Sequence, residues 1–267
     1  MPDRIVSALT IAGSDSGGGA GIQADLKTFA AHRVHGLSAI AALTAQHTRG
    51  VSAVHAPPTD FLRAQIDACF DDFRIAAVKL GMLANAGIIA TVSEALRAHA
   101  PPQVVLDPVM VATSGARLLE DAALDTLKRD LLPLASLVTP NLPEAELLLG
   151  RRISDHAEMR AACRDLLAAG PGAVLLKGGH LEDDGDVVID LFADAGGVRE
   201  LAHARLPHSA HGTGCTLASA VAANLCLGLA LYEACAAATD YVHRALRGGY
   251  RPGRGEVRVL DHIGAAQ

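Results

Sequence analysis

The stretch that decides the fold is Ile5–Gly21, with the sequence IVSALTIAGSDSGGGAG. Residues 5–12 are an apolar run of the length typical of a buried strand, and residues 13–21 are a glycine-rich loop. The segment Ile22–His32 follows at once and is predicted to be a helix. A strand that passes through a short loop into a helix is the repeating unit of α/β folds.

The alternation of strand and helix continues along the chain. It implies an α/β fold with a mostly parallel central sheet that is covered by helices on both faces. We find no repeat, low-complexity tract or linker, so residues 1–267 are expected to form a single domain. The glycine- and arginine-rich residues at the end are expected to be a loosely held surface segment. The remaining predicted strands are 37–45, 51–56, 76–80, 104–106, 137–139, 173–177 and the hairpin 187–192 with 198–201, and the remaining predicted helices are 59–73 (capped by Thr59-Asp60), one after Asn85, 121–132, one after Pro140, 155–169, one after Gly214, and 231–247.

The composition is that of a globular protein and excludes several classes of partner. The formal net charge is −6, so there is no basic field to attract nucleic acid or an anionic membrane. Aromatic residues make up only 3% of the chain, so stacking on single-stranded bases is not expected. No purely apolar run has the length of a membrane span, and the five cysteines form no C-x-x-C pair. A cytoplasmic location is therefore expected.

The glycine-rich loop does not belong to either of two common nucleotide-binding motifs. Gly19-x-Gly21-x-x-Ala24 fits a relaxed dinucleotide fingerprint, but residues 37–47 contain no Asp or Glu to bind a ribose. The sequence also has no G-x-x-x-x-G-K-[ST] phosphate loop. These observations argue against a dehydrogenase and against a P-loop kinase.

Polar side chains follow several predicted strands at their carboxyl ends, which is where ligands bind in parallel sheets. Asp107 and Glu144 carry the oxygen atoms that Mg²⁺ prefers, and we predict that they hold this ion through water. Glu144 could instead complement the N-terminus of its own helix. Lys177 is placed to neutralise phosphate as a point charge. Asp15 and Asn141 also lie at strand ends.

Other polar residues point to a small acceptor molecule. The amide of Gln46 presents a donor and an acceptor side by side, which matches the edge of an aminopyrimidine. Asp25 lies in the first predicted helix and could orient a substrate hydroxyl if this helix borders the cleft; otherwise it is an exposed helix charge. His180, His208 and His211 could line the same site, but they lack metal-like spacing.

The segment His211–Leu217, HGTGCTL, is predicted to bind an anion. Glycines on both sides of Thr213 let the backbone approach a ligand, and the N-terminus of the following helix attracts negative charge. Cys215 lies in the first turn, where this field would lower the pKa of a thiol. The alternative is a tight turn in which Thr213 only caps the helix. The hypothesis is a site for the negative charge that develops during phosphoryl transfer.

In this order, the motifs resemble the ribokinase-type superfamily, and within it the hydroxymethylpyrimidine/phosphomethylpyrimidine kinases of thiamine biosynthesis. The resemblance extends from Ala8 to Leu227 and implies a ribokinase-like three-layer α-β-α sandwich. The motifs that carry it are Leu9–Asp15 (LTIAGSD), Gly18–Lys27 (GGAGIQADLK), Asp107–Met110 (DPVM), Thr139–Glu144 (TPNLPE), Lys177–His180 (KGGH) and His211–Thr216 (HGTGCT).

The resemblance also implies roles for residues at the matching positions. The cofactors would be ATP and Mg²⁺, the acceptors hydroxymethylpyrimidine and its phosphate, and the assembly a homodimer. Cys215 would take the position at which many ribokinase relatives place an aspartate general base. A thiolate there could accept the hydroxyl proton, and the alternative is that Cys215 is only a packing residue. The implied pyrimidine pocket is Gly13, Asp25, Gln46, Met82 and Val109; the ATP site is Asn141, Lys177 and Thr213; the Mg²⁺ site is Asp107 and Glu144; the anion hole is Gly212, Thr213 and Gly214.

Two other functions stay open at this point. A pyridoxal-type kinase of the same superfamily is one, although Ala45-Gln46-x-Thr48 and Lys177–His180 resemble the pyrimidine kinases more. The other is a non-catalytic protein that binds pyrimidine. Lys177, Glu144 and the Gly-Thr-Gly loop argue against such a binder, because binding a pyrimidine alone needs none of them.

Overall fold

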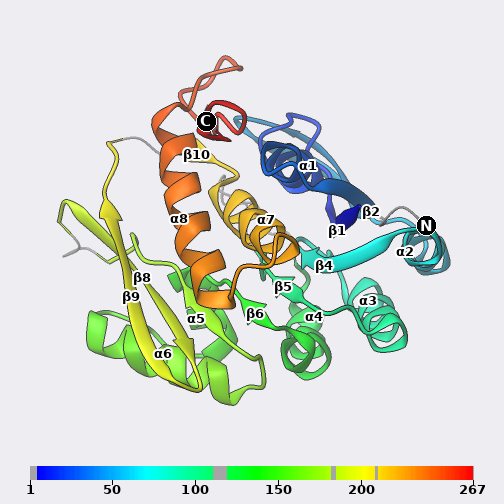
Figure 1. The fold of residues 1–267 in the computed structure, drawn as a ribbon, viewed down its shortest axis with the longest axis horizontal. Helices are drawn as coiled ribbons and strands as arrows, with labels where there is room; N and C mark the ends of the chain where they lie inside the picture. Colours follow the sequence, from blue (N-terminus) through cyan, green and yellow to red (C-terminus); the bar gives the residue numbers. More distant parts are fainter. Residues whose placement is uncertain (1–4, 111–118, 182–184, 208–209, 267) are drawn as a thin grey trace.

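In the computed structural model, which describes residues 5–110, 119–181, 185–207 and 210–266, a nine-stranded sheet lies between two layers of helices (Figure 1). The strand order is β3-β2-β1-β4-β5-β6-β7-β8-β9. The strands are β1 (Val6–Gly13), β2 (His35–His47), β3 (Gly50–His55), β4 (Arg74–Leu80), β5 (Val104–Leu106), β6 (Leu137–Val138), β7 (Val174–Leu176), β8 (Val187–Asp194) and β9 (Gly197–Ala204). The helices are α1 (Gly21–Ala31), α2 (Thr59–Asp72), α3 (Ala86–His99), α4 (Asp121–Thr126), α5 (Leu142–Leu149), α6 (His156–Ala168), α7 (Thr213–Cys226) and α8 (Leu231–Arg247).

The predicted mostly parallel sheet is confirmed. Strands β2, β1, β4, β5, β6 and β7 run parallel to one another, and β3, β8 and β9 join the two edges in antiparallel pairs. The carboxyl ends of the parallel strands therefore meet along one edge of the sheet, and the predicted polar residues follow these ends.

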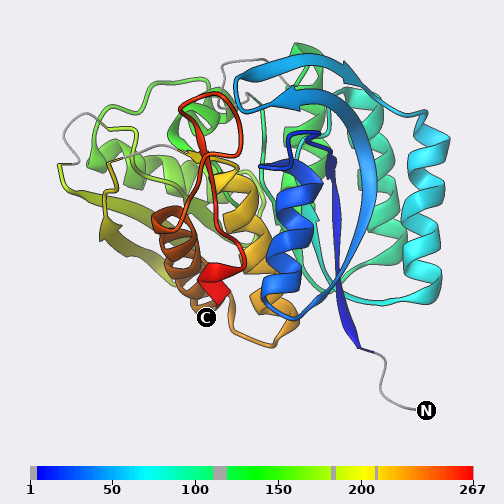
Figure 2. The same cartoon turned by 90° about the horizontal axis from the view of Figure 1, so that it is seen from above.

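The two faces of the sheet carry separate hydrophobic cores. Successive residues of a strand point to opposite faces, so Ala8 of β1 packs into one core while Leu9 and Ile11 pack into the other. Helices α1, α7 and α8 cover the face of Ala8, and α2 to α6 cover the opposite face (Figures 1 and 2). None of the helices in the described ranges is both long and apolar enough to span a membrane.

Most of the predicted helix starts are confirmed. The side chain of Asn85 accepts a hydrogen bond from the Ile88 N–H at the start of α3, and Asp155 caps α6 in the same way. The prediction that Thr59-Asp60 caps α2 is wrong, because the cap position is Pro58, and Thr59 is already helical. The helix predicted over 121–132 is also irregular: α4 continues as a π-helical turn and a 3₁₀ turn where Pro133 interrupts it.

The end of the chain is more tightly held than its composition suggests. A short strand β11 (Arg258–Val259) pairs in parallel with β10 (Ala210–His211), whose second residue begins the predicted anion-binding segment. Leu260 is buried, and the Tyr241 hydroxyl donates to the His262 carbonyl oxygen at 2.8 Å. The expectation of a surface segment fits residues 250–254, which are exposed, but a loose hold is wrong for residues 258–265, which pack against α8 and support the loop before α7.

The His262 side chain connects this segment to α7. Its Nε2 lies 3.0 Å from Thr216 Oγ1, and this hydroxyl donates its hydrogen to the Gly212 carbonyl oxygen at 2.8 Å. Since the hydroxyl has only one hydrogen, His262 must donate to it. Burial, together with the charge of Lys27, lowers the pKa of His262 to about 4 from its ordinary 6.5.

Replacing His262 with Gln should therefore change the pH dependence of stability. In the wild type, protonation below pH 6.5 favours the unfolded chain, so stability present above pH 6.5 is lost as the pH falls toward 4. The loss attributable to His262 is about 3 kcal/mol. In urea unfolding at pH 7.5, His262→Gln should have a lower free energy of unfolding than the wild type. At pH 4 the difference between the two proteins should be smaller by about 3 kcal/mol. A deficit that is the same at both pH values would contradict the assignment.

Candidate active site

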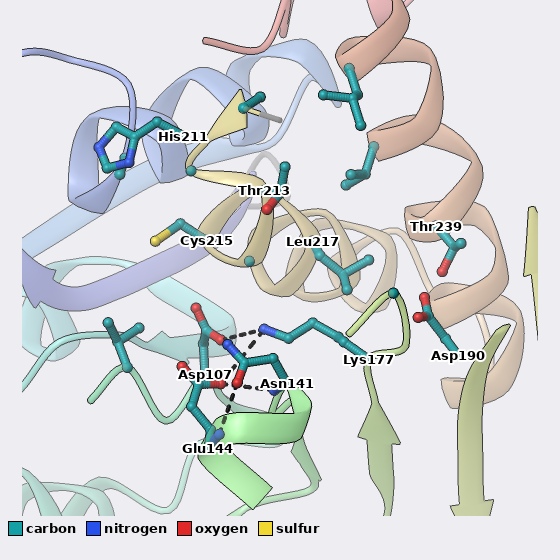
Figure 3. A pocket seen from close by; sticks show the side chains of 18 of the residues that line it. Asp107, Asn141, Glu144, Lys177, Asp190, His211, Thr213, Cys215, Leu217 and Thr239 are labelled. Carbon is teal, nitrogen blue, oxygen red and sulfur yellow. Dashed lines mark hydrogen bonds and ion pairs between the residues drawn. The ribbon is translucent and has the colours of Figure 1, made fainter. Parts of the chain in front are cut away.

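A cavity of about 630 Å³ lies beyond the carboxyl ends of the parallel strands. Figure 3 shows side chains from several of the elements that enclose it. Twelve of the thirteen predicted site residues line this cavity, namely Gly13, Gln46, Met82, Asp107, Val109, Asn141, Glu144, Lys177, Gly212, Thr213, Gly214 and Cys215. The exception is Asp25. His180 and His211 also line the cavity, whereas His208 lies outside the described residues.

Asp15 organises the glycine-rich loop after β1. Its Oδ1 accepts from the Gly17 N–H at 2.8 Å, and its Oδ2 accepts from the N–H groups of Gly19 and Ala20 at 2.9 and 2.8 Å. Burial alone would raise the pKa of Asp15, but the hydrogen bonds from His211 and from the loop backbone outweigh it, and the pKa is lowered. Sequence reasoning gave Asp15 no role, although an acidic residue before a run of glycines is typical of such a turn.

The side of the cavity next to β2 carries a group of apolar side chains together with the Gln46 amide. Met82 packs with Ala42, Ala84 and the partly buried Val109. A Cβ at Gly13 would lie 3.0 Å from Met82 Sδ, so glycine at this position leaves the methionine its place. These residues and the Gln46 amide form a surface that can pack against a flat ring and hydrogen bond to one edge of it.

The Asp25 carboxylate is fully buried and is not among the residues that line the cavity, so the expectation of an exposed helix charge is wrong, whereas its place in the pyrimidine pocket stays a prediction. Its Oδ2 accepts from Lys79 Nζ at 3.0 Å and from Thr10 Oγ1 at 2.6 Å, and its Oδ1 accepts from Ser219 Oγ at 2.7 Å. With both oxygens bound to protein groups, Asp25 is a buried counter-ion and not an exposed charge.

Lys79, the partner of Asp25, was not identified from the sequence as a residue of the site. Its side chain is fully buried at the cavity wall. Burial alone would lower the pKa of Lys79, but the negative charge of Asp25 and Asp107 outweighs it and the pKa is raised, so the ammonium is kept. The available signal was a lysine within the apolar run 76–80, since a buried strand does not hold a charge without a partner.

Lys177 extends toward two carboxylates on the other side of the cavity (Figure 3). Its Nζ is 3.2 Å from Asp107 Oδ1 and 3.9 Å from Glu144 Oε2. Burial would lower the pKa of Lys177, but these carboxylates outweigh that effect and raise it. A Cβ at Gly214 would lie 3.0 Å from the same Nζ, so the backbone at the start of α7 approaches this ammonium directly.

Glu144 takes one of the two roles that the sequence left open, that of complementing the N-terminus of its own helix, and its role in holding Mg²⁺ stays a prediction. Its Oε2 accepts from the Asn141 N–H at 2.8 Å, and Asn141 Oδ1 accepts from the Glu144 N–H at 2.8 Å, so the pair caps α5. Burial raises the pKa of Glu144 to about 7, against the opposing charge of Lys177 and with a further contribution from Asp107. In the described ranges, no three His, Cys, Asp or Glu side chains come together as a metal site.

The loop before α7 has the geometry of an anion site. Gly212 is the cap residue with a φ of +87°, and the first intrahelical bond runs from the Thr216 N–H to its carbonyl oxygen. The N–H groups of residues 213–215 precede this bond and face outward from the helix end. Thr213 is the first helical residue, so the alternative in which Thr213 only caps the helix is wrong.

The expected low pKa of Cys215 is not found. Burial raises the pKa of this thiol to about 11; the charge of Lys79 opposes the shift, and the carboxylates of Asp107 and Asp25 add to it. Desolvation and two nearby carboxylates thus outweigh the field of the helix end. At neutral pH, Cys215 is a protonated thiol.

Replacing Gly212 with Ala should disrupt this site, and Gly228 offers a matched control. Both glycines have a φ near +88°. A Cβ at Gly212 would collide with the Gly19 carbonyl oxygen, whereas no described atom lies within 4 Å of a Cβ at Gly228. Gly228→Ala should lower the free energy of unfolding by about 1 kcal/mol and leave kcat/KM intact. Gly212→Ala should cost more stability and lower kcat/KM by about 100-fold. Equal effects of the two changes would show that the contact with Gly19 is unimportant.

Comparison with known proteins gives a consistent result. Residues 15–260 match the family described as phosphomethylpyrimidine kinase. The chain is 49% identical over 256 residues to the hydroxymethylpyrimidine/phosphomethylpyrimidine kinase of Rhizobium meliloti, covering 94% of this chain and 95% of that protein. It is 50% identical over 261 residues to a thiamine biosynthesis bifunctional protein of Geobacter sulfurreducens, covering 98% of this chain but only 53% of that longer protein.

Solved structures agree with this match. A phosphomethylpyrimidine kinase from Clostridium difficile superimposes with a TM-score of 0.81 at 40% identity, covering 91% of this chain and 100% of that one. A pyridoxal kinase from Staphylococcus aureus in complex with AMP-PCP and pyridoxal superimposes with a TM-score of 0.88 at 32% identity, covering 97% and 94%. The order of the strands in the sheet and a match along nearly the whole sequence together show that this chain belongs to the phosphomethylpyrimidine kinase family, with a ribokinase-like fold.

Proposed function

We propose that this protein transfers the γ-phosphoryl group of ATP to 4-amino-5-hydroxymethyl-2-methylpyrimidine and then to the resulting monophosphate, in thiamine biosynthesis. The observation that carries the proposal is one cavity that joins an apolar, amide-bearing side with the anion loop and Lys177. In each transfer, an acceptor oxygen forms a bond to the γ-phosphorus while the bond to the bridging oxygen of ADP breaks. An alcohol acceptor also loses its proton.

The acceptor would lie against Gly13, Met82 and Val109 with one ring edge on the Gln46 amide. Apolar packing orients the ring, and the amide selects an acceptor that carries a donor and an acceptor side by side. This arrangement would direct the hydroxymethyl group toward the anion loop. Asp25 acts in this proposal only through Lys79, to which it is paired at 3.0 Å.

The nucleotide would use the opposite side of the cavity. Asn141 and Lys177 lie side by side through a bridge between their backbones, and Thr213 begins α7. The ammonium of Lys177 and the N–H groups of residues 213–215 are suited to the charge that spreads over the transferring phosphoryl oxygens. Related kinases have been solved with AMP-PCP and with ADP, which supports ATP as the donor.

Asp107 and Glu144 fit Mg²⁺ as part of its ligand set. Mg²⁺ is usually held by one or two carboxylates and completes its octahedron with water and substrate phosphates, so two carboxylates suffice. When bound, the ion would neutralise charge on the phosphates. Lys177 lies closer to Asp107 than to Glu144, at 3.2 against 3.9 Å, and would share this task of neutralisation.

The proposal is tested by measuring ADP formation with a panel of acceptors. The pyrimidine alcohol and its monophosphate should both be turned over, and EDTA should abolish both reactions. Pyridoxal is the relevant rival acceptor, because the Staphylococcus aureus pyridoxal kinase superimposes with a TM-score of 0.88. Turnover of pyridoxine or pyridoxal alone would favour that activity. Tight binding of the pyrimidine without any ADP would favour a non-catalytic binder.

Replacing Cys215 with Ala should affect both transfers to a similar extent, within about 3-fold of each other. The reason is that a thiol with a pKa of about 11 is a poor proton acceptor at neutral pH. Cys226→Ala is the matched control, since Cys226 lies in the same helix with a pKa also near 11 but does not line the cavity. A loss confined to phosphorylation of the alcohol would restore the proton-transfer role for Cys215.

A single-domain organisation, a cytoplasmic location and a homodimer stay predictions. The exposed apolar side chains of Leu43 and Val54 lie in the paired strands β2 and β3, which form one edge of the sheet. A second copy could cover them, and the molar mass in solution would decide whether it does.

A further inference from the structure

The His211 ring links the glycine-rich loop to the amide that faces the acceptor. Its Nε2 lies 3.1 Å from Asp15 Oδ2 and 2.8 Å from the side-chain nitrogen of Gln46. His211 is the last residue of β10, Asp15 lies in the loop after β1, and Gln46 lies near the end of β2. A single ring nitrogen therefore connects three segments that are far apart in the sequence.

The hydrogen count at this nitrogen decides which groups can surround it. The carboxylate of Asp15 only accepts, so the contact at 3.1 Å requires a hydrogen on His211 Nε2. An Nε2 that carries a hydrogen cannot also accept one from the Gln46 amide nitrogen. It can, however, share its one hydrogen between Asp15 Oδ2 and an amide oxygen in the same place, as a three-centre hydrogen bond. The contact with Asp15 thus favours the Gln46 amide with its oxygen toward His211.

The amide atom of Gln46 that faces Thr44 must be a hydrogen-bond donor, which is consistent with an amide oxygen toward His211. Thr44 Oγ1 lies 2.7 Å from the Ser14 carbonyl oxygen and 3.2 Å from Gln46 Oε1. Its single hydrogen goes to the Ser14 carbonyl oxygen, which is nearer and can only accept, whereas the Gln46 amide can turn to present its nitrogen. Toward Gln46, the Thr44 hydroxyl can then only accept. Turning the amide by 180° places its nitrogen toward Thr44 and satisfies both ends at once.

We propose that His211 is a positioning residue that, together with Thr44, fixes the orientation of the Gln46 amide and so sets the preference for an acceptor with an amino group. Held at both ends, the amide keeps one N–H and one oxygen lone pair side by side on its remaining edge. The amide oxygen on the His211 side accepts from the amino group, and the N–H on the Thr44 side donates to a ring nitrogen. This inference rests on the proposed function.

The test compares two acceptors in the wild type and in variants. The acceptors are the 4-aminopyrimidine alcohol and the analogue in which hydrogen replaces the amino group. The wild type should prefer the amino compound by at least about ten-fold in kcat/KM, as expected for one hydrogen bond made without a competing partner. His211→Ala should lose most of this preference, mainly through a higher KM for the amino compound. His211→Gln, whose amide can still donate, should recover part of it.

Two further variants keep the test decisive. Thr44→Val removes the other anchor at nearly the same volume and should also reduce the preference, which covers the case in which His211→Ala does not fold. His156→Ala, at an exposed position in the first turn of α6, is the matched control and should keep the wild-type preference.

The inference and the proposed function fail in different ways. Unchanged preference in both His211→Ala and Thr44→Val, or an equal loss of kcat for both acceptors, would overturn the inference and leave His211 as a support of the Asp15 loop. A wild type that turns over neither pyrimidine would instead overturn the proposed function.

Discussion

The site depends on the buried ion pair between Lys79 and Asp25. A charged group away from water is tolerated only with a partner and with its remaining hydrogen-bonding capacity satisfied. Here the Asp25 carboxylate also accepts from Thr10 and Ser219, so one cluster joins β1, β4, α1 and α7. The glycine-rich loop precedes α1 and the anion loop precedes α7. By fixing both helices against the same two strands, the pair fixes the relative position of the two loops that enclose the cavity.

The glycines of these loops are required because backbone atoms of other segments occupy the space that a Cβ would need. A side chain at Gly212 would collide with the Gly19 carbonyl oxygen, and one at Gly21 would collide with the Gly13 carbonyl oxygen. The C-terminal segment adds to this close packing, since a Cβ at Gly19 would lie 2.7 Å from Val259 Cγ1. A motif that looks like a flexible ligand-binding loop is therefore also a tightly packed contact between distant parts of the chain.

The sequence was sufficient to predict the parts of the site that depend on strand order. Parallel strands share one edge for their carboxyl ends, so residues that directly follow β1, β5 and β7 come together wherever the helices lie. It was not sufficient where a property depends on an unknown partner. Asp25 and Lys79 are 54 residues apart, and nothing local to either identifies the other. The C-terminal strand pairs through two residues, too few to leave a periodic signal.

The pKa of Cys215 also depends on partners that are distant in the sequence. The same partners give a physical reason for a cysteine at this position in place of an aspartate. The N-terminus of α7 favours a thiolate, and this local effect is visible in the sequence. The opposing carboxylates are not, because Asp107 follows β5 and Asp25 lies in α1. An aspartate at position 215 would place another carboxylate near these two, with Lys79 already paired to Asp25. A neutral thiol avoids that repulsion and leaves the ammonium of Lys79 paired. If phosphoryl transfer has a loose transition state, the alcohol carries little charge until late in the reaction, and charge stabilisation contributes more than a strong base. A protonated cysteine at this position is then compatible with transfer to an alcohol and to a phosphate in the same cavity.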